Sequence, residues 1–163
     1  WLVRAYVGSA LFADKKTQGY VDMVSATRSP GSTLKPFIYG LAMDESLIHS
    51  ESLLVDAPRW KSQYQPENFS SRFSGAVSAG DALRKSLNVP AVQVLEKLGP
   101  ALFNNLLLNA GVTPILPDNG KPNLSMALGG FGISMESLLD LFGALGREGK
   151  VARLRFSKQE ALV

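Results

Sequence analysis

Ser32 and Lys35 are the two residues whose types and spacing could carry out acyl transfer. A serine hydroxyl is a weak nucleophile until a base takes its proton. A lysine three residues further on lies on the same face of a helix, within about 5–6 Å between Cβ atoms. A helix start also presents backbone N–H groups and the positive end of the dipole to a developing oxyanion. Because burial lowers the pKa of a lysine, it would favour the basic form of Lys35.

A second polar pair follows at Ser86 and Asn88, in the pattern S-x-N. Spacing alone gives both patterns little weight. With 17 Ser, 9 Lys and 7 Asn in 163 residues, chance predicts roughly one S-x-x-K and about 0.7 S-x-N, and the sequence contains one of each. On spacing alone, the better interpretation is Ser32 as an ordinary helix start and Asn88 as an ordinary helix end.

The elements that must position these residues form an α+β domain, with a small sheet ahead of a helical block. Alternating apolar residues in the segment 1–29 predict strands. Residues 32–43 predict a central helix that is apolar on nearly every face, with a proline tolerated in its first turn. Residues 50–77 are polar and predict irregular structure. The helical region is expected to extend over about 32–147.

Prolines, glycines and serines mark the later helices. Ser78 and Asp81 resemble a capping box with Asp in place of Glu. Pro90 suits the first position of a helix that ends at residue 99, and a further helix covers about 100–111. Serine 134 begins the last helix, which ends near residue 147. The pair Gly129–Gly130, which lies between the helix over about 100–111 and the last helix, is typical of a turn.

Composition excludes several classes of function. A chain of 163 residues that is 45% hydrophobic and 19% charged is one globular domain. A net charge of +3 gives little reason to expect nucleic acid as a partner. The absence of cysteine excludes a thiol nucleophile, a disulfide and a cysteine-ligated zinc, and the single histidine, His49, excludes a multi-histidine site. No cofactor is predicted, and no apolar run is long enough for a membrane span.

Four landmarks, taken together, are far more specific than either motif. They are residues 28–39 around Ser32 and Lys35, the Y-x-P-x-N sequence at 64–69, residues 75–92 around Ser86 and Asn88, and residues 127–130 with the helix that follows. In this order they resemble the transpeptidase domain of penicillin-binding proteins, in the style of the bifunctional class A enzymes, and they cover most of the chain.

The resemblance implies a β-lactamase/transpeptidase-like fold and acyl transfer on D-Ala-D-Ala stem peptides of peptidoglycan, with β-lactam antibiotics as inhibitors. It implies Ser32 as the nucleophile and Lys35 as the base in acylation. Ser86 would relay a proton, and Asn88 would bind the substrate amide and orient Lys35. Tyr64 and Asn68 are candidates for substrate binding, with an exposed loop as an equally good interpretation.

The family's K-T-G motif does not occur in the 163 residues; Lys16-Thr17-Gln18 lacks the glycine and precedes the serine. We therefore expect residues 1–163 to be the N-terminal part of a transpeptidase domain with an incomplete antiparallel sheet, inactive or weak alone. The resemblance places the longer parent at the periplasmic face of the inner membrane, with a glycosyltransferase domain and an N-terminal anchor that this chain lacks. An exposed sheet edge would favour oligomers.

Two alternatives remain at this point. One is a β-lactamase or penicillin-sensing domain, for which Glu67 and Glu136 are candidates for a deacylating carboxylate by residue type only. The other is an inert truncated domain or a partner-binding module. Rapid turnover of a penicillin would favour the first alternative, whereas a long-lived adduct would exclude it.

Overall fold

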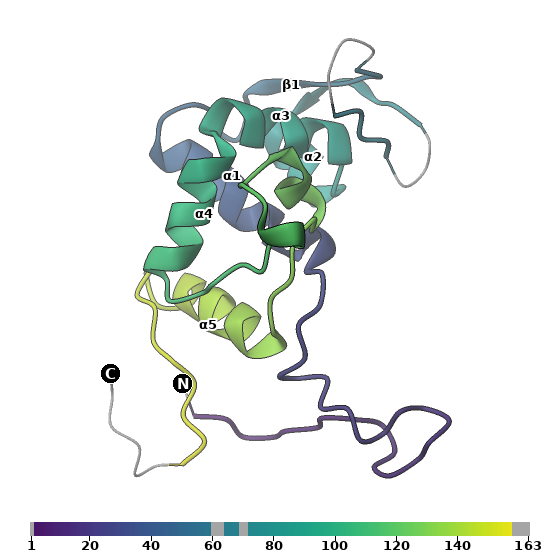
Figure 1. Ribbon diagram of the computed structural model, residues 1–163. Coiled ribbons are helices and arrows are strands. Elements are labelled where there is room, and N and C mark those ends of the chain that lie inside the picture. The colour runs from purple at the N-terminus through teal and green to yellow at the C-terminus, as the bar shows by residue number, and fades with distance from the viewer. Residues whose placement is uncertain (1, 60–63, 69–71, 158–163) are drawn as a thin grey trace.

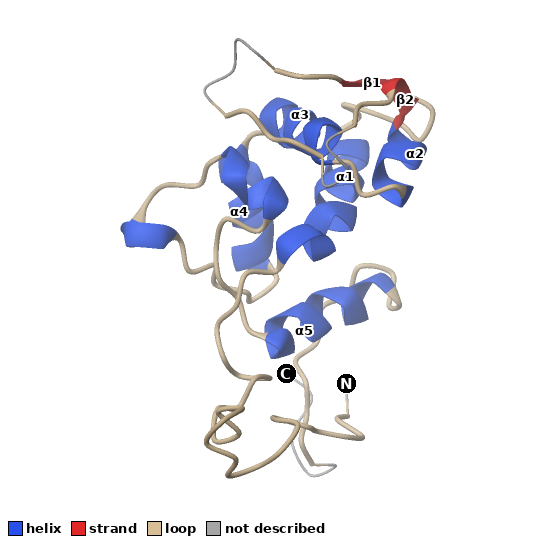
Figure 2. Ribbon diagram, turned by 90° about the vertical axis from the view of Figure 1, so that its right-hand side faces the viewer, coloured by secondary structure: helices blue, strands red, loops and turns tan. Residues whose placement is uncertain are grey.

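A computed structural model describes residues 2–59, 64–68 and 72–157. Most of its helices gather into one block, with two short strands at the edge of that block (Figure 2). Segments near the two termini lie together beyond α5, at the opposite end of the molecule (Figure 1). The α-helices are α1 (Lys35–Asp44), α2 (Ala79–Arg84), α3 (Asn88–Leu98), α4 (Pro100–Asn109) and α5 (Met135–Leu145). The 3₁₀ helices are η1 (Gly31–Leu34), η2 (Pro117–Asn119) and η3 (Leu124–Leu128).

Helices α1 and α3 form the centre of the core. Ile38 and Ala42 of α1 are fully buried, and so are Val92 and Leu95 of α3. The expectation of a central, buried helix that is apolar on nearly every face is confirmed for its core-facing residues, whereas Gly40 and Met43 are exposed. Helices α1 and α3 pack against each other, and both contact η3. The short helix η1 leads directly into α1, so residues 31–34 are fixed at the end of this core.

Helix starts follow the predicted capping chemistry. The side chain of Ser78 accepts a hydrogen bond from the backbone N–H of Asp81, which satisfies one of the free donors at the start of α2. The side chain of Ser134 accepts from the N–H of Ser137 in the same way. Helix α3 begins two residues earlier than its proline predicts, because Pro90 occupies the third position, where an N–H has no intrahelical partner anyway.

The sheet lies in the region predicted to be irregular. Strand β1 (Leu53–Asp56) pairs antiparallel with β2 (Gly75–Ser78), with Leu54 opposite Val77. Both of these residues are buried, whereas Leu53 and Val55 are exposed, so β1 shows the alternation of a half-buried strand. The polar composition of residues 50–77 as a whole hid this four-residue pattern.

The expectation of strands over residues 1–29 is wrong for the part of this segment that the structure describes. In the described part of this segment, residues 2–29, β-type pairing is limited to single bridges, at Leu2 with Arg155 and at Arg28 with Ile133. An alternating sequence forms a strand only where a second backbone runs beside it for several residues. These residues instead adopt turns and extended loop.

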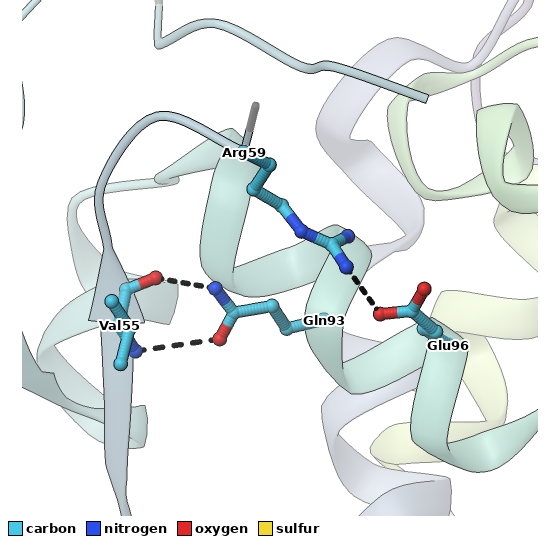
Figure 3. A network of polar contacts seen from close by, with 4 residues as sticks. All are labelled: Val55, Arg59, Gln93 and Glu96. Carbon is cyan, nitrogen blue, oxygen red and sulfur yellow. Dashed lines mark hydrogen bonds and ion pairs between the residues drawn. The ribbon is translucent and has the colours of Figure 1, made fainter. Parts of the chain in front are cut away.

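The outer edge of β1 is covered by a side chain of α3 (Figure 3). The carboxamide of Gln93 donates to the carbonyl oxygen of Val55 at 2.5 Å and accepts from its N–H at 3.3 Å. One turn further along α3, Glu96 forms a 2.6 Å ion pair with Arg59. The backbone groups that an exposed edge would offer to another chain are therefore occupied at Val55.

Candidate active site

Lys35 is buried at the start of α1 and is surrounded by oxygen atoms. Its side chain is 1% exposed. The Nζ atom donates to the backbone oxygens of Ser86 at 2.8 Å and Leu87 at 3.2 Å. It also lies 2.7 Å from Oδ1 of Asn88 and 3.3 Å from Oγ of Ser86. The S-x-x-K lysine and the S-x-N motif, more than 50 residues apart in sequence, therefore form one cluster.

Burial lowers the pKa of Lys35 from 10.5 to about 8. The cause is desolvation, because a charged ammonium loses its hydration on entering the protein interior. The surrounding oxygens are dipoles that satisfy the N–H groups. A lysine in this setting exists partly as the neutral amine near neutral pH, which is the form that can accept a proton from a serine.

Ser86 is held in a backbone conformation that non-glycine residues rarely adopt. Its φ angle is +52°, in the left-handed region where a side chain costs about 1–2 kcal/mol. The turn ends α2 and is closed by a hydrogen bond from Ser86 N–H to the oxygen of Leu83. It also brings the carbonyls of Ser86 and Leu87 to Lys35. The strain therefore lies at the residue that presents acceptors to the lysine.

Asn88 is held on both sides by the loop at residues 64–68. The backbone N–H of Asn88 donates to Oδ1 of Asn68 at 2.8 Å. Its Nδ2 donates to the backbone oxygen of Glu67 at 2.7 Å. Because that carbonyl can only accept, the amide nitrogen must face it, and Oδ1 is left to face Lys35. The Y-x-P-x-N loop thus fixes which atom of Asn88 meets the lysine.

Ser32 lies one turn before Lys35, in η1, and is exposed. The backbone N–H of Lys35 donates to the carbonyl oxygen of Ser32. Within the residues that the structure describes, the Ser32 hydroxyl forms no hydrogen bond. Contacts between a nucleophile and its base are in general often longer without substrate and tighten in the reacting complex. The structure thus brings Lys35, Ser86 and Asn88 into direct contact, and Ser32 lies exposed one turn before Lys35.

Gly129 holds the segment before Ser32 against η3. Its φ angle is +83°, and a Cβ atom at this position would lie 2.3 Å from the backbone nitrogen of Gly31. The hydroxyl of Ser29 donates to the Gly129 carbonyl at 2.6 Å and accepts from the Gly31 N–H at 3.2 Å. Only a residue without a side chain permits this approach, so the glycine turn supports the segment that carries Ser32.

The two candidate substrate-binding residues have different surroundings. Tyr64 is half-buried against the core, and burial raises its pKa. Asn68 is 5% exposed, and its carboxamide contacts Asp56 and Asn88. A role for either residue in binding substrate stays a prediction. Of the two carboxylates considered by type, Glu67 is exposed beside Asn88, whereas Glu136 lies in the first turn of α5.

Two residues that support this site are absent from the sequence-based candidates. Gly129 was predicted only as a turn. Asp56 is completely buried at the end of β1 and accepts from Asn68 Nδ2 at 2.7 Å and from the Ser74 N–H at 2.8 Å. The available indication was an aspartate directly after three apolar residues, since an acidic residue on the buried face of a strand needs hydrogen-bond partners.

In the described ranges there is no cluster of three His, Asp or Glu side chains that could hold a metal ion. The one histidine, His49, is exposed and accepts a hydrogen bond from the Glu51 N–H. Among the helices of the described residues, none is both long enough and apolar enough to span a bilayer.

Comparison with known proteins identifies the family. The family model "Penicillin binding protein transpeptidase domain" matches residues 3–161, so the chain belongs to this family. The chain is 49% identical to penicillin-binding protein 1C of Escherichia coli K12 over 161 residues, covering 99% of this chain and 21% of that protein. This agrees with the motifs, which resemble the 1C type of class A protein.

Further relatives support the same assignment. Penicillin-binding protein 1F of Bacillus subtilis 168 is 35% identical over 158 residues, covering 87% of this chain and 21% of the relative. The chain thus spans about a fifth of the length of these curated relatives.

Solved structures confirm the α+β fold of this family. The crystal structure of penicillin-binding protein 1A from Haemophilus influenzae superposes with a TM-score of 0.71 at 20% identity, covering 85% of this chain and 21% of that one. A ceftriaxone acyl-enzyme complex of penicillin-binding protein A from Mycobacterium tuberculosis gives 0.73 at 19% identity, covering 88% and 37%.

Proposed function

We propose that this chain is part of a serine D,D-transpeptidase that cross-links peptidoglycan stem peptides. The observation that carries the proposal is the contact of Lys35 Nζ with Ser86 and Asn88 in a chain of this family. A buried lysine with a pKa of about 8 is a suitable base for a serine one helical turn away.

In the proposed acylation, Lys35 Nζ takes the proton of the Ser32 hydroxyl as Oγ attacks the carbonyl carbon of the penultimate D-Ala. The backbone N–H of Ser32 donates to the oxyanion that forms. Collapse of the tetrahedral intermediate breaks the C–N bond, and the leaving amine of the terminal D-Ala receives a proton through the Ser86 hydroxyl. The product is an ester on Ser32.

Deacylation completes the proposed transfer. The amine of a neighbouring stem peptide attacks the ester carbonyl, loses a proton to the site and forms the new amide, and Ser32 Oγ is reprotonated. A β-lactam would form the same ester as its ring amide opens, and the adduct would persist. Asn88 would bind the substrate amide while its Oδ1 orients Lys35.

Periplasmic location, a membrane anchor outside this sequence and low activity of the 163 residues alone belong to the same proposal. The family pattern places K-T-G after S-x-N, and this motif does not occur in the sequence. The segment carrying it would supply the second oxyanion donor and the groups that bind the substrate carboxylate.

A labelling experiment tests the proposal. The chimera consists of this chain followed by the segment that comes after the matched region in E. coli penicillin-binding protein 1C. The chain and the chimera are each treated with a fluorescent penicillin. Mass spectrometry then locates the adduct. We expect slow labelling of the chain and stable, stoichiometric labelling of the chimera at Ser32, with none in Ser32→Ala. A folded chimera that is not labelled, while the E. coli domain is, would contradict the proposal; rapid hydrolysis of the penicillin would favour a β-lactamase.

A further inference from the structure

Asp56 is a buried acidic residue that lies outside the S-x-x-K and S-x-N motifs. It ends β1, is 0% exposed and is hydrogen-bonded to Asn68 of the loop that contacts the S-x-N motif. Its two carboxylate oxygens have separate partners, with Asn68 Nδ2 on Oδ1 at 2.7 Å and the Ser74 N–H on Oδ2 at 2.8 Å. Burial of a carboxylate is unfavourable unless its oxygens are hydrogen-bonded, and both oxygens are bonded here.

The hydrogen bonds that start at Asp56 have a fixed direction. An ionised carboxylate offers acceptors only, so it holds the nitrogen of the Asn68 carboxamide toward itself. The backbone oxygen of Arg72, 3.0 Å from the same nitrogen, acts in the same sense. The carboxamide oxygen of Asn68 then faces the other way and accepts from the Asn88 N–H at 2.8 Å. Reversal of the amide would place two donors against each other.

This bond fixes the first residue of α3. The N–H of Asn88 is among the first four of the helix, which have no intrahelical acceptor. Asn68 supplies that acceptor, and Glu67 next to it holds the Asn88 side chain. The Oδ1 atom of Asn88 is thereby kept 2.7 Å from Lys35 Nζ. Four residues from β1, the 64–68 loop, α3 and α1 form one directed path.

We propose that Asp56 is a positioning residue that acts through Asn68 to hold the Asn88 carboxamide oxygen on Lys35. The inference rests on the proposed role of Lys35 as the base. In this arrangement Asn68 is structural support for Asn88. No hydrogen bond or ion pair joins Asp56 to Lys35, two described residues, so in this proposal Asp56 acts through the intervening amides.

The test measures the pKa of Lys35 directly, so it does not depend on acylation of Ser32. The pKa of Lys35 is measured in the 163-residue chain by NMR titration of ¹³Cε-labelled lysine, with assignment by Lys35→Met. Asp56→Asn removes one acceptor and permits the Asn68 amide to reverse. Because the ammonium then loses an oriented oxygen, we expect the pKa of Lys35 to fall by on the order of 1. Asp44→Asn, which removes an exposed carboxylate from α1, is the matched control and should change nothing.

A double-mutant cycle separates positioning from a direct charge effect. Asn68→Leu breaks the path and leaves the carboxylate in place. If Asp56 acts through Asn68, then Asp56→Asn has no further effect on the pKa of Lys35 in the Asn68→Leu background. An equal effect of Asp56→Asn in both backgrounds, or no effect in either, would overturn the proposal.

A measurement on the unmodified chain covers the case in which these variants do not fold. Native-state hydrogen exchange measures how fast the N–H groups of Asn88 and Ser74 exchange with solvent. Both donate hydrogen bonds in the proposed path, so both should be protected. We expect both to exchange as slowly as the Val77 amide of β2. Exchange of Asn88 at the rate of an exposed amide would refute the path. Failure of penicillin labelling would leave these results unchanged, so the two proposals fail separately.

Discussion

Asn88 Oδ1 lies 2.7 Å from Nζ of Lys35, although 53 residues separate them in the sequence. The contact joins the start of α1 to the start of α3, the two helices at the centre of the core. A lysine in this position is oriented by dipoles of the S-x-N turn and desolvated by the core. The position of the Lys35 side chain is thus determined by the fold.

The lowered pKa of Lys35 predicts a pH dependence of stability. Between about pH 8 and 10.5, the unfolded chain carries a proton on Lys35 that the native chain has lost. Unfolding therefore takes up a proton, and a rise in pH favours the native state. From pH 8 to 10 we expect the free energy of unfolding to gain about 2 kcal/mol relative to the Lys35→Met variant.

Chemical denaturation of both proteins at several pH values measures this difference. The pH series ends at 10 because, at higher pH, Tyr39 lowers the free energy of unfolding as the pH rises, which is opposite to the effect of Lys35. Burial, and secondarily the charge of Asp56, raise the pKa of Tyr39, so its contribution to stability is lost as the unfolded tyrosine ionises. Equal slopes for the native chain and Lys35→Met would show that Lys35 is not desolvated.

Gly129→Ala should displace the segment that carries Ser32. The new Cβ would lie 2.3 Å from the nitrogen of Gly31, and the backbone would be strained at φ +83°. Gly111→Ala is the matched control, since Gly111 also has a positive φ, +75°, but nothing lies within 4 Å of its Cβ position. We expect about 1–2 kcal/mol of destabilisation for Gly111→Ala and more than twice that for Gly129→Ala.

Penicillin labelling of the chimera extends this comparison. The rate should fall strongly for Gly129→Ala and stay unchanged for Gly111→Ala, because only the first alters the position of Ser32. Similar stability and similar labelling in the two variants would mean that the contact between Gly129 and Gly31 has no role in the site.

Substitutions of Ser86 separate its backbone from its hydroxyl. Ser86→Gly relieves the strain at φ +52°, whereas Ser86→Ala keeps it. We expect the glycine variant to be more stable than the alanine variant by about 1 kcal/mol in thermal unfolding. Both lack the proposed proton relay, so both should label more slowly by on the order of 10²–10⁴. Labelling of Ser86→Ala at the native rate would exclude the relay.

Gln93→Leu should uncover the edge of β1. Its carboxamide occupies both the N–H and the carbonyl of Val55 (Figure 3). Without it, the edge can pair with another chain, and light scattering should show self-association. Asn105→Leu adds an exposed leucine on α4 and should not associate. If both variants behave alike, the edge is not what Gln93 protects.

Local sequence patterns predicted the helices well. The caps at Ser78 and Ser134, the first-turn proline of α1 and the helix start at Pro100 depend on neighbours within one turn, and the structure has them as expected. The helix expected from residue 32 is α-helical only from Lys35, because residues 31–34 form the 3₁₀ helix η1. The strands were predicted poorly. A four-residue strand such as β1 depends on its partner β2 about 20 residues away, and four residues carry too little periodicity to identify it alone.

The site was predictable only in part for the same physical reason. S-x-x-K and S-x-N each occur about as often as chance allows, and only the order of several landmarks pointed to a shared site. The partners of Asn88 could not be predicted, because Asn68 and Asp56 meet it through loop and strand pairing. The approach of Gly129 to Gly31 likewise joins residues that are almost 100 positions apart.

The pH dependence of Ser32 labelling in the chimera tests the central claim most directly, since that claim is that Lys35 is the base. The labelling rate should rise roughly tenfold per pH unit at low pH and level off above an inflection near pH 8, where Lys35 becomes neutral. A rate that is flat from pH 6 to 9, or that continues to rise toward the ordinary pKa of lysine, would contradict the account.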